Sequence, residues 1–197
     1  MEKKFNEQES LKLINEMIAQ AKGNAQEGDG KYSLLWGYII AIASLSHFVA
    51  FLHSVETGIH YSNIIWGVAT PLGFVITAIF AFRDKKKELI RTYTDSITNS
   101  LWIGFMCSLL LSGIILSGKN GFLIYPMATL LMTFTLFVNS RAYKMKWMYT
   151  YLVICLVCTI LYKFIPLLYY PLLMAISMTA GTIIPGHILS KKAKEHV

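Results

Sequence analysis

The chain has 197 residues, of which 55% are hydrophobic and 15% are charged, and its formal net charge is +7. A soluble domain typically has about 25% charged residues, so this composition excludes a soluble globule, which would lack the polar residues to cover its surface. The cations lie between long apolar runs and do not form one basic face, which argues against a nucleic-acid-binding protein. Three cysteines lie inside apolar runs, and their odd number argues against a disulfide framework.

The first predicted element is an amphipathic helix over residues 6–23. Asn6 and Glu9 fit the N-cap and N3 positions of a capping-box-like start, and Gly23 fits a helix stop. At about 100° per residue, the apolar side chains share one half of the helix: Leu11, Leu13, Ile14, Met17, Ile18 and Ala21. Residues 24–31 are rich in glycine and polar side chains, so they predict a flexible tether.

The apolar face of this predicted helix needs a surface on which to be buried. Its glutamates offset its lysines, so attraction to anionic lipid is weak. Three alternatives stay open: docking on the cytoplasmic loops of the same chain, self-association, or a protein partner. The interaction face is predicted to comprise Leu11, Ile14, Met17 and Ile18. Residues 1–30 would then form a cytoplasmic helix and tether, and residues 31–197 a transmembrane domain.

Six apolar runs are long enough to cross a bilayer core of about 30 Å, which takes roughly 20 residues of helix. The predicted spans are Ser33–His53, Asn63–Phe82, Ser96–Ser117, Phe122–Ser140, Trp147–Ile165 and Pro171–Leu189. Lipid offers no hydrogen-bond partner to the backbone, so each span should be helical. The predicted fold class is therefore an all-α membrane protein with six transmembrane helices, arranged as three antiparallel hairpins.

The distribution of lysine and arginine predicts the orientation. Sixteen of the eighteen cations lie before the first span, after the sixth, or in the loops that follow the second and fourth spans. Only Lys119 and Lys163 fall on the other side. Because loops rich in lysine and arginine stay cytoplasmic, we expect both termini in the cytoplasm. The basic stretch 83–91 is then a determinant of topology.

Small residues at fourfold spacing predict close helix packing, which matters in lipid because the hydrophobic drive between helices is lost. They form one stripe in each of three spans: Ala69, Gly73, Thr77 and Ala81; Ser96, Ser100, Gly104, Ser108 and Ser112; and Ser177, Gly181 and Pro185. The second stripe is the longest, so we expect it to be a packing seam.

Few polar side chains inside the spans could carry chemistry. The spans contain no acidic residue, which argues against proton relays, aspartyl proteolysis and carboxylate metal sites. His47 lies well inside the first span, at a depth similar to that of Thr70, and should form an interhelical hydrogen bond. Asn99, Asn139 and His187 share a cytoplasmic depth and predict either a hydrogen-bonded clamp or a binding site.

Two further motifs are weak evidence for a redox site or a metal site. Cys155 and Cys158 have the C-x-x-C spacing of redox proteins, but they lie in mid-span, where a thiolate is disfavoured. His53, His60 and Glu56 flank the first outer loop, without the spacing that a metal site needs. We therefore predict no catalytic residue, no metal site and no cofactor.

The stretch "EQESLKLINEMIAQAKG" followed by "LLWGYII", about residues 7–40, resembles a group of small, largely uncharacterised bacterial inner-membrane proteins. In these proteins a short amphipathic helix precedes several spans. The resemblance implies location in the bacterial inner membrane. It implies no activity.

The sequence favours a non-catalytic membrane protein that acts through its N-terminal helix. Its partners would be the lipid bilayer and either another protein or a second copy, and not nucleic acid. A small-solute transporter or channel subunit is the alternative, and a membrane enzyme acting on lipid or thiol is a third hypothesis.

Overall fold

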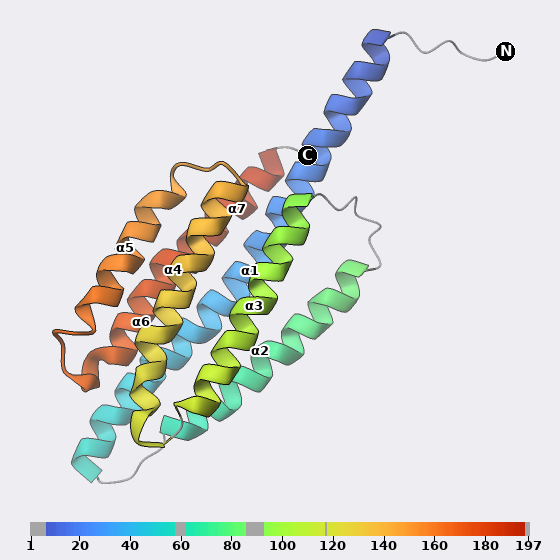
Figure 1. The fold of residues 1–197 in the computed structure, drawn as a ribbon. Helices are drawn as coiled ribbons and strands as arrows, with labels where there is room; N and C mark the ends of the chain where they lie inside the picture. The colour runs from blue at the N-terminus through green and yellow to red at the C-terminus, as the bar shows by residue number, and fades with distance from the viewer. Residues whose placement is uncertain (1–6, 58–61, 86–92, 117, 196–197) are drawn as a thin grey trace.

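We describe the protein from a computed structural model, which covers residues 7–57, 62–85, 93–116 and 118–195. All regular secondary structure in these ranges is helical (Figure 1). This confirms the predicted all-α class. Five helical segments are long and apolar enough to cross a membrane: Gly30–Ser54, Ile64–Arg83, Ser96–Ile115, Gly121–Ala142 and Leu167–Lys192. Their length and composition indicate a multi-pass membrane protein.

The first helix, α1, is one continuous helix from Glu7 to Thr57. The predicted stop at Gly23 and the predicted break over residues 24–31 are therefore wrong. A glycine inside a helix costs only about 1 kcal/mol relative to alanine, so Gly23 alone does not end the helix. No proline occurs in the first 70 residues, and from Gly30 onward α1 packs against α7, which stabilises the helical form.

The remaining helices follow the predicted runs with one exception. They are α2 (Ser62–Lys85), α3 (Tyr93–Ile115), α4 (Ile124–Ala142), α5 (Met148–Leu161), α6 (Tyr170–Met178) and α7 (Ile184–Glu195). The exception is α5, which has 14 residues and is only about 21 Å long. It covers part of the predicted span Trp147–Ile165 and falls short of a bilayer core of about 30 Å.

The last span is built from four helical pieces and begins with a 3₁₀-helical turn, Leu167–Tyr169. A π-helical turn, Thr179–Ile183, joins α6 to α7. Pro185 follows this turn, and proline has no N–H for the carbonyl four residues earlier. The π-helical turn therefore lies where the regular hydrogen-bond ladder is interrupted. Pro171 lies in the first turn of α6, as the sequence predicted.

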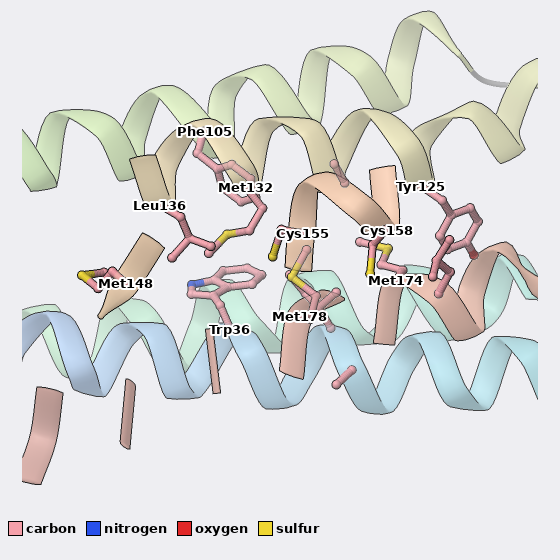
Figure 2. Packing of buried hydrophobic residues seen from close by; sticks show 14 of the residues in the cluster. Trp36, Phe105, Tyr125, Met132, Leu136, Met148, Cys155, Cys158, Met174 and Met178 are labelled. Atoms are coloured by element: carbon pink, nitrogen blue, oxygen red, sulfur yellow. The ribbon is translucent and has the colours of Figure 1, made fainter. Parts of the chain in front are cut away.

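Helix α1 is the middle helix of one side of the bundle (Figure 1). It packs against α6 and α7 on one side and against α2 on the other, while α4 packs between α3 and α5. In the shared core, Met132 and Leu136 of α4 point toward Trp36 of α1 (Figure 2). Sulfur-bearing side chains supply much of this core. Methionine is unbranched and fills irregular gaps between helices well.

The glycines show where helices approach most closely. A Cβ atom at Gly73 would lie 2.9 Å from the Trp36 ring, and one at Gly181 would lie 2.9 Å from Cys155 Sγ. Both of these glycines therefore lie at tight helix contacts. A Cβ atom at Gly104 would meet nothing within 4 Å. The expectation that Gly104 lies in a packing seam is wrong, because this part of α3 faces outward.

The seam between α1 and α7 includes Gly30, which the sequence placed in the tether. A Cβ atom at Gly30 would lie 3.0 Å from the carbonyl oxygen of Gly186. Ser33 Oγ also donates a 3.0 Å hydrogen bond to the carbonyl oxygen of Thr182. The backbones of α1 and α7 thus meet directly, and this contact fixes the start of the first span against the end of the last.

Candidate functional site

His47 is the centre of a polar cluster where α1, α2 and α4 meet. The indole Nε1–H of Trp66 in α2 donates to His47 Nδ1 over 2.9 Å and lies 3.1 Å from the hydroxyl oxygen of Tyr125 in α4. The Tyr125 hydroxyl is also hydrogen-bonded to His47 Nδ1. His47 and Tyr125 are buried. The predicted interhelical hydrogen bond is present, but its partners are Trp66 and Tyr125 and not Thr70.

These contacts determine the tautomer of His47. The indole N–H can only donate, so Nδ1 must accept and therefore carries no proton. In a neutral ring the proton is then on Nε2. This Nε2 atom is buried and has no hydrogen-bond partner among the described residues. The cluster thus joins three helices through one ring nitrogen and leaves one donor unpaired.

A second polar cluster lies one helical turn further along α4. Thr129 Oγ1 donates to the carbonyl oxygen of Tyr125 over 3.0 Å, and it lies 3.1 Å from the Tyr162 hydroxyl and 3.4 Å from Ser177 Oγ. Cys155 Sγ lies 3.5 Å from the carbonyl oxygen of Ser177. We name Tyr125, Thr129, Tyr162 and Ser177, together with His47 and Trp66, the polar column. Its two clusters are joined through the backbone of α4, where Thr129 Oγ1 bonds to the carbonyl oxygen of Tyr125.

The three residues predicted to share a cytoplasmic depth do not form one described cluster. Asn99 is exposed on α3, whereas Asn139 is buried on α4. His187 is exposed on α7, and its Nε2 is hydrogen-bonded to the hydroxyl of Tyr38 over 2.8 Å. No described hydrogen bond joins Asn99, Asn139 and His187 to one another. Asn139 instead lines a small internal cavity with Trp102.

The cysteines and histidines of the other motifs are spread through the fold. Cys155 and Cys158 are both buried and free, whereas Cys107 is exposed. His53 is exposed, and His60 lies outside the described residues. Within the ranges covered by the structure, no group of three His, Cys, Asp or Glu side chains could hold a metal ion.

The predicted interaction face is exposed. The exposed fractions of Leu11, Ile14, Met17 and Ile18 are 61%, 51%, 46% and 60%. In Figure 1 the segment that carries them projects beyond the other helices. Docking of this face on the bundle, one of the three alternatives, is therefore not the arrangement in this structure. On the same segment, Lys12 Nζ lies 4.0 Å from Glu16 Oε1, as expected for a weak surface pair.

The small-residue stripe of α3 forms the floor of a lateral groove. This groove has a volume of about 590 Å³ and lies between α3 and α4. The hydroxyl of Ser100 donates back to the carbonyl oxygen of Ser96 over 2.8 Å, so this serine uses its hydrogen on its own helix. Leu131 and Phe134 of α4 form the opposite wall.

Sequence reasoning found His47 but missed both of its partners. Trp66 and Tyr125 lie near the ends of predicted spans, where aromatic residues usually form a belt at the membrane interface. The available signal was their position, because Trp66 and Tyr125 lie near the starts of the second and fourth predicted spans, and a buried indole or phenol needs a partner.

No protein-family model, no curated protein and no solved structure matches the chain. The resemblance to small bacterial inner-membrane proteins therefore stays a prediction.

Proposed function

We propose that the protein is a non-catalytic integral membrane protein that binds a protein partner, or a second copy of itself, through the N-terminal segment of α1. The observation that carries this proposal is the exposed face of Leu11, Ile14, Met17 and Ile18 on a segment that projects from the bundle. Full burial of a side chain of this size contributes roughly 1.5–3 kcal/mol. Four of them are enough for a specific contact after the cost of ordering the interface.

The proposal includes a topology and a location. We propose six spans in three hairpins, in which α5 forms the central part of the fifth span. Both termini would lie in the cytoplasm of a bacterial cell. The cation distribution supports this orientation. The N-terminal face would then meet a cytoplasmic protein, or the same face of another copy.

The test is the double variant Ile14→Glu with Ile18→Glu, which places two charges on the apolar face. We expect a normal membrane level and a loss of co-purification, or a smaller particle if the partner is a second copy. Lys12→Glu is the matched control, since it changes the net charge by the same amount on the polar side. The proposal fails if the double variant keeps its assembly, or if the control loses it equally.

The alternative function, a small-solute transporter or channel subunit, draws on the polar column. Uncharged hydroxyls inside a bundle can replace part of the hydration of a solute. Flux through proteoliposomes that contain the purified protein would distinguish the two functions. In that assay, Thr129→Val should lower the flux if the polar column is a pathway.

A further inference from the structure

We propose that the bundle holds one structural water molecule in the cavity between α3, α4 and the π-helical turn, bridging Trp102 and Asn139. The cavity has a volume of about 20 Å³ and is lined by Trp102, Asn139 and Gly181 among others. A cavity needs roughly 10–15 Å³ of such volume to hold a water molecule. The space therefore fits one water and no larger ligand.

Two of the residues that line this cavity carry an unpaired polar atom. Trp102 Nε1 and Asn139 Oδ1 are buried, and neither has a hydrogen-bond partner in the described part of the chain. The exposed fraction of Asn139 is only 8%. One of the two atoms is a donor and the other an acceptor. A buried polar group without a partner costs about 1–3 kcal/mol, so a molecule that pairs both would stabilise the fold.

The chemistry of the two atoms selects water over an ion. An indole N–H can only donate, so it would repel a cation that Asn139 Oδ1 might otherwise attract. A water molecule accepts the hydrogen of Trp102 and donates one of its own to Asn139.

The second hydrogen of this water would be donated to the last span. Gly181 lines the same cavity. Its carbonyl lies four residues before Pro185, which has no N–H to donate. A buried water typically makes about three hydrogen bonds, and Trp102, Asn139 and the Gly181 carbonyl would supply that number. The water would thus join α3, α4 and the last span at one point.

The experiment is NMR on full-length protein with ¹⁵N-labelled tryptophan in deuterated detergent micelles. The chain has four tryptophans, so four indole signals are expected, and loss of one signal in Trp102→Phe assigns Trp102. We expect a cross-peak from the Trp102 indole proton to water with NOE and ROE of opposite sign. Opposite signs mark a bound water molecule that stays far longer than the short-lived water on a protein surface.

Two variants sharpen the test. Asn139→Leu should abolish this cross-peak while the other three indole signals keep their positions. Leu189→Met, an apolar change in the same cavity wall, should retain it. The proposal is overturned if the wild-type Trp102 indole shows no such cross-peak, or if the cross-peak keeps its intensity in Asn139→Leu. If Asn139→Leu does not fold, the wild-type spectrum alone decides.

Discussion

Replacing Gly30 by alanine should loosen the seam between α1 and α7. The new Cβ atom would lie 3.0 Å from the backbone nitrogen of Ser190 and 3.0 Å from the carbonyl oxygen of Gly186. Both are backbone atoms, so no side-chain rotation can relieve the contact, and the two helices must move apart. Overpacking of this kind typically costs about 1–3 kcal/mol.

Gly104→Ala is the matched control for this change. Both glycines lie inside helices, so each alanine gains about 1 kcal/mol of helix propensity, and this gain cancels in the comparison. At Gly104 the Cβ atom would meet nothing within 4 Å, so no packing cost arises there. The free energy of unfolding of Gly30→Ala should therefore be lower than that of Gly104→Ala by about 1–3 kcal/mol.

Reversible unfolding of the purified protein in mixed micelles, as sodium dodecyl sulfate is added, measures this difference. The far-ultraviolet circular dichroism signal of each variant should be compared with that of the wild type. If Gly30→Ala is as stable as Gly104→Ala, then α1 and α7 do not meet at this point, and the account of the seam is refuted.

Two further predictions concern the polar column and the topology. Thr129→Val keeps the shape of the side chain but leaves the Tyr162 hydroxyl without this partner, so it should lower the free energy of unfolding by about 1–3 kcal/mol. Thr159→Val, which removes only a bond within α5, should cost less, and equal losses would contradict a role for the column. In a background without native cysteines, a cysteine at Lys86 should be shielded from impermeant thiol reagents in intact cells and one at Asn120 should be labelled; the reverse pattern would invert the topology.

The apolar runs predicted the positions of five long helices because lipid leaves the backbone no alternative to helix. The ends of elements were harder to predict. Gly23 looked like a helix stop from its neighbours alone, yet α1 continues through it. Local propensity at that site is weak, and the packing of Gly30 on α7, some 150 residues later in the chain, is invisible to a local pattern.

The candidate site was likewise only partly predictable from the sequence. The depth of His47 predicted a buried interhelical bond, and the structure has one. Its partners depend on how α2 and α4 rotate about their own axes, which no spacing rule specifies. The stripe through Gly104 shows the converse case, because fourfold spacing marks a face of α3 but does not say whether that face meets a helix or lies open.

Because α1 is continuous, a movement of its N-terminal segment is transmitted along the helix into the bundle. From Glu7 to Gly30 the helix extends for about 35 Å, while its next two turns are fixed against α7 and the last span. A tilt of only about 5° at the seam would move the tip by about 3 Å over an arm of that length. A protein bound at the tip would therefore apply a torque to the same helix that carries His47, and through it to the partners of His47 on α2 and α4.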